Sequence, residues 1–135
     1  MPGMGRTTVE SGSPFEPVIG FSRAVRAGHH IAVAGTAPIM PDGGDPPSDA
    51  HGQAKRCLEI IAAALEQMGS SIHDVVRTRC YLVSADDWKD VGRAHGDVFG
   101  EVSSNVRPAS TMVVVTGFLD PRWRVEMEAD AIVDH

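Results

Sequence analysis

The sequence predicts a single α+β domain, in which helices are segregated from several strands. The first observation is length, because 135 residues fit one ordinary domain and are too few for two. The second is the order of periodic segments, in which short apolar or alternating runs surround two longer segments with helical spacing. We therefore expect the order ββαβαββ.

The N-terminal segment is expected to be a flexible arm. Residues 1–14 are rich in Gly, Ser and Thr and carry little apolar surface. Such a segment has little burial with which to offset the entropy of ordering. We therefore place one domain over residues 15–135.

Two short runs then predict a hairpin, residues 21–25 and 30–37. They are separated by residues 26–29, where Gly28 supplies the positive φ that a tight connection often needs. Residues 41–47 are rich in Gly, Pro and Asp and are expected to form a loop.

Two helices follow in the sequence. Ser48 or Asp49 can cap the first, and Gly69 stands where it would end. Its apolar residues recur at helical spacing and predict a core-facing stripe, namely Cys57, Leu58, Ile61, Leu65 and Met68.

The second helix is capped by Ser84 or Asp86. It places four residues on one side: Trp88, Val91, His95 and Phe99. Gly92 and Gly96 each cost it about 1 kcal/mol relative to alanine, so its stability must come from docking.

The remaining strands differ in pattern. Residues 75–83 alternate, with Val76, Thr78, Cys80 and Leu82 on one face and Val75, Arg77, Arg79, Tyr81 and Val83 on the other. Residues 111–116 form an apolar strand, 117–123 a turn, and 124–133 a strand with Glu126, Glu128 and Asp130 on one face. Arg77 and Arg79 are candidate partners for Glu126 and Glu128 across the sheet, each exposed pair contributing about 0–1 kcal/mol.

Composition narrows the class of partner. The net charge is −6 and the 12 basic residues are scattered, which disfavours binding to nucleic acid. Neither a secretory signal nor a membrane-length apolar run is present, so we expect a cytoplasmic protein without a membrane partner.

Metal and cofactor motifs are not recognisable. Cys57 and Cys80 have no CxxC spacing and are expected to be reduced core residues. The six histidines form no HxxxH or HExxH pattern, and neither GxGxxG nor GxxxxGK[ST] occurs. We expect no metal and no organic cofactor.

An ordered series of motifs resembles the Rid/YjgF family of reactive-intermediate deaminases, formerly called L-PSP endoribonucleases. The principal segments are Arg107-Pro108-Ala109-Ser110-Thr111-Met112-Val113, similar to Pro-Ala-Arg-Ser-Cys-Val, and Glu126-Met127-Glu128-Ala129, similar to Ile-Glu-Ala. Others are Gly20-Phe21-Ser22-Arg23-Ala24, Val33-Ala34-Gly35-Thr36-Ala37-Pro38, Gln53 with Leu58, and Asp74-Val75-Val76-Arg77-Thr78. The resemblance spans residues 15 to 133.

The resemblance implies a chorismate-mutase-like sandwich, with one mixed sheet and two helices on one face, and a homotrimer with sites between subunits. It also implies hydrolysis of an imine or enamine, with Glu128 positioning the attacking water and backbone near Met112 holding the imine. A carboxylate can serve by accepting a proton from that water. From the residues alone, Glu128 also fits a solvated acidic strand face.

The chain departs from the family pattern at several positions. Ser110 stands where the deaminases carry an arginine that clamps the substrate carboxylate, a charge-assisted contact that serine cannot reproduce. Phe21 replaces a tyrosine and Gly92 an asparagine. Arg107, at a phenylalanine position, can either replace the missing arginine or lie exposed.

Three functions remain open at this stage. The first is Rid-like hydrolytic deamination of a reactive imine or enamine with altered specificity. The second is a non-catalytic small-molecule binding or sensing trimer. The third, ribonuclease activity, is disfavoured by the acidic charge.

Overall fold

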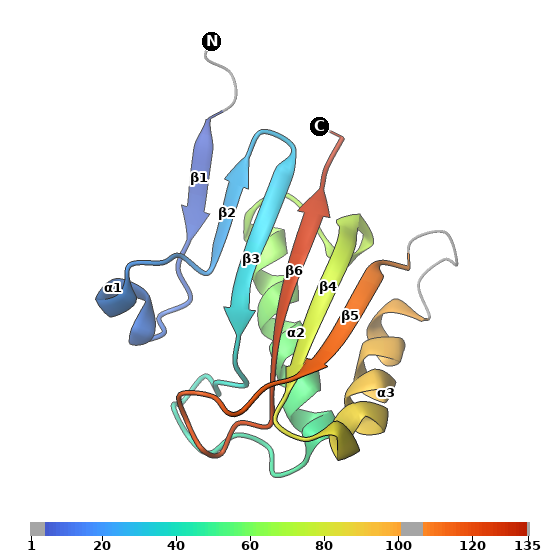
Figure 1. Ribbon diagram of the computed structural model, residues 1–135. Helices are drawn as coiled ribbons and strands as arrows, with labels where there is room; N and C mark the ends of the chain where they lie inside the picture. The colour runs from blue at the N-terminus through green and yellow to red at the C-terminus, as the bar shows by residue number, and fades with distance from the viewer. Residues whose placement is uncertain (1–4, 101–106, 135) are drawn as a thin grey trace.

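The computed structural model describes residues 5–100 and 107–134, which form one sheet and its covering helices (Figure 1). The strands are β1 (Arg6–Val9), β2 (Ala24–Ala27), β3 (His30–Thr36), β4 (Val75–Leu82), β5 (Ala109–Val114) and β6 (Val125–Ile132). The helices are α1 (Phe15–Ile19), α2 (Ala50–Gln67) and α3 (Trp88–Phe99), with 3-10 turns at η1 (Ile72–Asp74) and η2 (Ala85–Asp87).

The six strands lie in the order β1-β2-β3-β6-β4-β5. Neighbours are antiparallel except β4 and β5, which are parallel and joined through α3. The sheet is therefore mixed, and the order ββαβαββ is found from β2 to β6. This arrangement puts β5 at one edge and β6, with its acidic row, in the interior of the sheet.

The expectation of a flexible arm over residues 1–14 is wrong for residues 6–9. Arg6–Val9 pairs along its whole length with β2, and the short helix α1 follows it. Backbone hydrogen bonds to the edge of β2 order this segment although it buries little apolar surface. A strand of four residues is too short to show a periodic pattern in the sequence.

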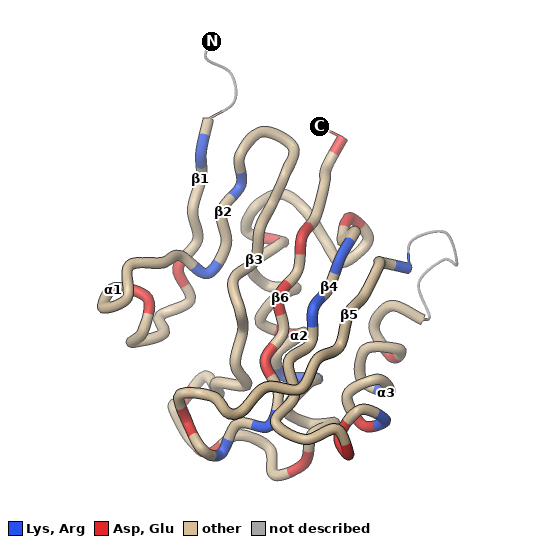
Figure 2. The backbone as a smooth tube through the Cα atoms, viewed as in Figure 1, with Lys and Arg blue, Asp and Glu red and all other residues tan. Residues whose placement is uncertain are grey.

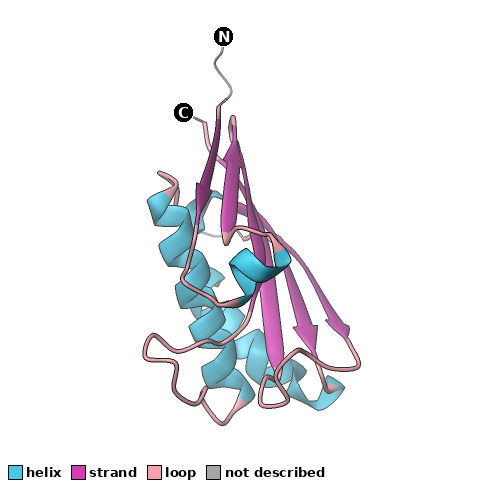
Figure 3. Cartoon of the chain, turned by 90° about the vertical axis from the view of Figure 1, so that its left-hand side faces the viewer, coloured by secondary structure: helices cyan, strands magenta, loops and turns pink. Residues whose placement is uncertain are grey.

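The two long helices cover one face of the sheet, and no long helix of the described residues lies on the opposite face (Figures 1 and 3). Between them lies the core, to which the expected stripe of α2 contributes Cys57, Leu58, Ile61, Leu65 and Met68. Asp49 caps α2 by accepting from the backbone N–H of Gly52. In α3, Val91 and Phe99 are buried as expected, whereas Trp88 at its first turn is 56% exposed.

A register shift changes the expected faces at the start of β4. The pairing with β6 shifts between Val75 and Arg77, which leaves Val75 buried and Val76 exposed. The strict alternation expected for residues 75–83 therefore begins only at Arg77. A bulge of this kind inserts an unpaired residue, and the local sequence does not reveal it.

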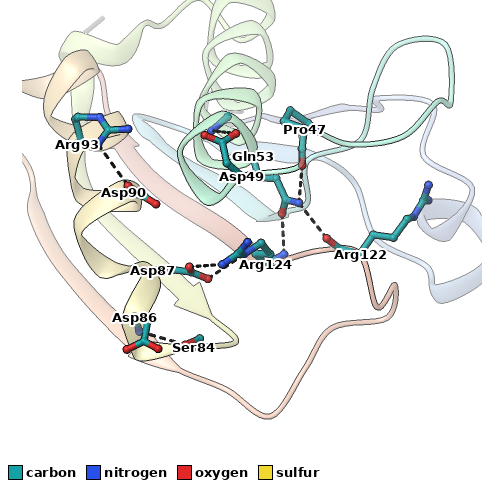
Figure 4. A network of polar contacts seen from close by, with 11 residues as sticks. Pro47, Asp49, Gln53, Ser84, Asp86, Asp87, Asp90, Arg93, Arg122 and Arg124 are labelled. Atoms are coloured by element: carbon teal, nitrogen blue, oxygen red, sulfur yellow. Dashed lines mark hydrogen bonds and ion pairs between the residues drawn. The ribbon is translucent and has the colours of Figure 1, made fainter.

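A buried glutamine joins three segments at the lower end of the sheet (Figure 4). The Gln53 side chain donates to the carbonyls of Pro47 and Arg122 and accepts from the Arg124 N–H. Arg124 in turn binds Asp87 through two nitrogens, at 2.6 and 3.2 Å. These contacts fix the turn that delivers the chain into β6.

Candidate functional site

Glu128 lies on the face of β6 that the helices leave uncovered. Arg79 of β4 stands beside it in register, and its Nη1 donates to Glu128 Oε1 at 2.9 Å. The Tyr81 hydroxyl donates to the same oxygen at 2.7 Å. The expected pairing of Glu128 with an arginine across the sheet is confirmed. In Figure 2 the acidic positions of β6, in red, run beside the basic positions of β4, in blue.

The two donors leave one side of the carboxylate available. Both bonds end on Oε1, and no described residue donates to Oε2. The bond to Glu128 raises the pKa of the Tyr81 phenol, and it also raises the pKa of the Arg79 guanidinium. Both partners therefore remain protonated donors at neutral pH and hold the carboxylate in one orientation.

A pocket of about 450 Å³ surrounds this carboxylate. Its lining includes Phe21, which precedes β2, and the charged side chains of Arg6, Arg79, Glu128 and Asp130. A volume of this size suits a small metabolite. The Phe21 ring is held by Arg23, whose guanidinium carbon lies 5.3 Å from the ring centroid.

Ser110 lies on the opposite face of the sheet from Glu128. It stands in register with Thr78, which is buried on the helix side, whereas Glu128 is in register with Arg79. Thr78 donates to Ser110 Oγ at 2.8 Å, and the Thr78 hydroxyl lies 2.8 Å from His95 Nε2 of α3. The short serine side chain is thus part of a polar contact between β5, β4 and α3.

Burial determines the charge state of His95, the last member of the hydrogen-bonded series Ser110–Thr78–His95. Desolvation lowers the pKa of the His95 imidazole, and the ring packs on Phe99 with centroids 4.5 Å apart. A neutral imidazole is therefore favoured at physiological pH.

The other residues singled out from the sequence are dispersed. Met112 packs partly against the core between sheet and helices, and Gly92 lies on α3 one turn before His95. Arg107 is exposed immediately before β5. A single chain therefore brings together Glu128 and Phe21, but not Ser110, Met112, Gly92 or Arg107 with them.

Sequence reasoning missed a buried ion pair next to α1. Glu16 is 1% exposed and accepts from Arg23 Nη2 at 3.3 Å as well as from Ser11. Arg23 also lines a second cavity of about 420 Å³ beside α2, and its buried Nε has no hydrogen-bond partner among the described residues. Glu16 in α1 and Arg23 before β2 are seven residues apart, a spacing that gives no sequence signal for such a contact.

Burial also shifts the pKa values of other titratable groups. Desolvation raises the pKa of Glu126, the neighbour of Glu128 on the same face, and raises that of the Cys80 thiol to about 11. Cys57 and Cys80 are buried and free, as expected. Within residues 5–100 and 107–134, no three His, Cys, Asp or Glu side chains are placed to hold a metal ion, and no helix there is long and apolar enough to cross a membrane.

Comparison with known proteins identifies the class. Residues 12–133 match the family model described as Endoribonuclease L-PSP, and the chain belongs to this family, also known as Rid/YjgF. A Mycobacterium tuberculosis member of the YjgF/YER057c/UK114 family has a crystal structure with a TM-score of 0.85 and 42% identity, covering 96% of this chain and 100% of that one. The fold is accordingly the chorismate-mutase-like fold of these proteins.

Three relatives show the range of names in the family. An uncharacterized protein of Streptomyces coelicolor is 40% identical over 91% of this chain and 89% of its own length. A RutC family protein of Pyrococcus abyssi is 36% identical over 86% of this chain and 88% of its own. A 2-iminobutanoate/2-iminopropanoate deaminase of Escherichia coli is 28% identical over 83% of this chain and 86% of its own.

Proposed function

We propose that this protein hydrolyses a small reactive imine or enamine, with a specificity that differs from that of arginine-bearing family members. The observation that carries the proposal is the geometry of Glu128. One carboxylate oxygen is fixed by Arg79 and Tyr81, and the other has no donor among the described residues. A carboxylate held in this way, in a pocket of metabolite size, suits the positioning of water.

The chemistry needs one base and no cofactor. Glu128 accepts a proton from water while the water oxygen bonds to the imine carbon, and the nitrogen takes up a proton. The hydroxyl proton of the resulting carbinolamine passes to nitrogen as the C–N bond breaks, so ammonia leaves and the carbonyl product remains. An enamine first becomes an imine by protonation at carbon, after which the same steps follow.

A homotrimer is the assembly we propose for this activity. Val113 and Ile132 are 41% and 51% exposed on the sheet face without helices, and β5 is an edge strand that pairs with β4 on one side only among the described strands. Monomers rarely leave such a face and edge uncovered. Mass measurement in solution should give about three times the 14.4 kDa of the chain.

A non-catalytic binding or sensing trimer is the second candidate. It is favoured by the combined loss of polar groups at Ser110, Phe21 and Gly92 relative to the family pattern. Ribonuclease activity, which the family model's description names, is disfavoured by the net charge of −6.

The test is hydrolysis of imines generated in situ by an amino-acid oxidase, with trapping of unreacted imine by semicarbazide. Glu128→Gln should reduce the rate by about 10²-fold or more if Glu128 is the base. Glu126→Gln is the matched control, because it makes the same change on the same face of β6. If the wild-type protein accelerates the hydrolysis of none of the imines tested, the non-catalytic binding trimer is favoured.

A further inference from the structure

The pocket around Glu128 carries two charges of each sign. Arg6 and Arg79 supply the cations, and Glu128 and Asp130 supply the anions. Asp130 Oδ1 also lies 3.3 Å from His30 Nε2, at the far side of the same row. With these four groups ionised, the pocket is neutral overall but strongly polarised.

The guanidinium of Arg79 has hydrogen-bond donors that no described residue uses in this pocket. Its side chain is 41% exposed, and among the described residues only its Nη1 makes a hydrogen bond, to Glu128. The remaining N–H groups of the guanidinium form the fork that binds a carboxylate through two parallel hydrogen bonds. Glu128 holds the guanidinium in place, so little side-chain entropy remains to be lost when a ligand binds.

The other candidate anchors are less well placed. Ser110 bonds with Thr78 on the helix side of the sheet, and Arg107 precedes β5 rather than lining the pocket. Within one chain, Arg79 is the guanidinium that stands in register with Glu128.

We infer that Arg79 is the carboxylate anchor of this pocket and that its ligand is a small zwitterion, with a cationic nitrogen facing Glu128 and Asp130. The inference rests on the proposed function for the reaction of that ligand, but its binding can be measured separately. The two carboxylates would repel a simple anion, and the two arginines would repel a simple cation. A zwitterion satisfies both, and a protonated 2-imino acid has this charge pattern.

The experiment compares three small probes by calorimetric or NMR titration. L-Alanine carries both charges, pyruvate only the carboxylate, and alaninamide only the cation. We expect wild type to bind alanine about tenfold or more tightly than either of the others, as one charge-assisted hydrogen bond implies. Arg79→Gln should remove that preference, and Arg77→Gln, the same change two residues away on β4, should retain it.

A second variant separates an anchor from a merely structural role. Glu128→Gln keeps Arg79 and removes a repulsive carboxylate, so it should bind pyruvate more tightly than wild type does. Equal alanine affinity in Arg79→Gln and Arg77→Gln would overturn the inference, as would loss of binding in Arg107→Gln instead. Failure of the wild type to prefer alanine would overturn the zwitterion assignment.

The outcomes also separate this inference from the proposed function. If no imine is hydrolysed but alanine binding depends on Arg79, the deaminase proposal fails and the anchor stands. If imino acids are hydrolysed with the same KM in wild type and Arg79→Gln, the deaminase proposal stands and the anchor fails.

Discussion

Replacement of Thr78 by valine tests whether Ser110 belongs to a structural hydrogen-bond chain. Thr78 is 1% exposed, and its hydroxyl lies 2.8 Å from both Ser110 Oγ and His95 Nε2. Valine keeps the shape of threonine but leaves His95 without its partner in a partly buried site. An orphaned polar group of this kind costs about 1–3 kcal/mol.

Thr78 and Ser110 differ in exposure, so their variants should differ in the loss of stability. Ser110 is exposed on the edge strand, so water can replace its bond, and Ser110→Ala should cost about 0.5 kcal/mol or less. With a urea slope of about 2 kcal/mol/M, Thr78→Val should lower the unfolding midpoint by about 1 M. Urea unfolding followed by circular dichroism, with unchanged slope, is the measurement.

The lowered pKa of His95 also predicts how the stability of the protein changes with pH. Because the pKa of His95 is lowered in the folded state, its contribution to stability is present above the ordinary histidine value of about 6.5 and is lost as pH falls. His95→Gln should therefore lose less stability than wild type between about pH 7 and 5. A Thr78→Val protein no less stable than Ser110→Ala would refute the chain as a structural element.

Three further predictions concern stability. The stability of Glu126→Gln relative to wild type should increase as pH rises from about 4 to 7, because burial raises the Glu126 pKa and ionisation of this carboxyl destabilises the folded state. An equal stability difference between the two proteins at both pH values would contradict this. Gly92→Ala should stabilise α3 by about 0.5–1 kcal/mol, since a Cβ there meets no atom within 4 Å, whereas Gly52→Ala should destabilise α2, where the Cβ would lie 2.6 Å from Asp49 Oδ1. Gln53→Met should cost about 2–4 kcal/mol in thermal or urea unfolding by freeing three backbone groups, and a loss under about 1 kcal/mol would refute that role.

Much of the fold followed from periodicity in the sequence. The apolar spacing of α2 predicted its buried stripe, and the alternation of β6 predicted that Glu126, Glu128 and Asp130 share a face. Side chains in regular elements repeat with a fixed period, so burial of one member fixes the direction of the others. Alternation also made the arginines of residues 75–83 candidate partners for the acidic row, but it did not say which arginine faces Glu128.

The tertiary structure alone decided the relations between strands. Pairing with β2 orders Arg6–Val9, and a shift in the β4–β6 register exposes Val76 in place of Val75. Register also puts Ser110 and Glu128 on opposite faces and puts Arg79 in the Glu128 pocket. A one-residue slip between strands exchanges the two faces of a sheet, and that choice depends on contacts distant in sequence, which no local pattern encodes.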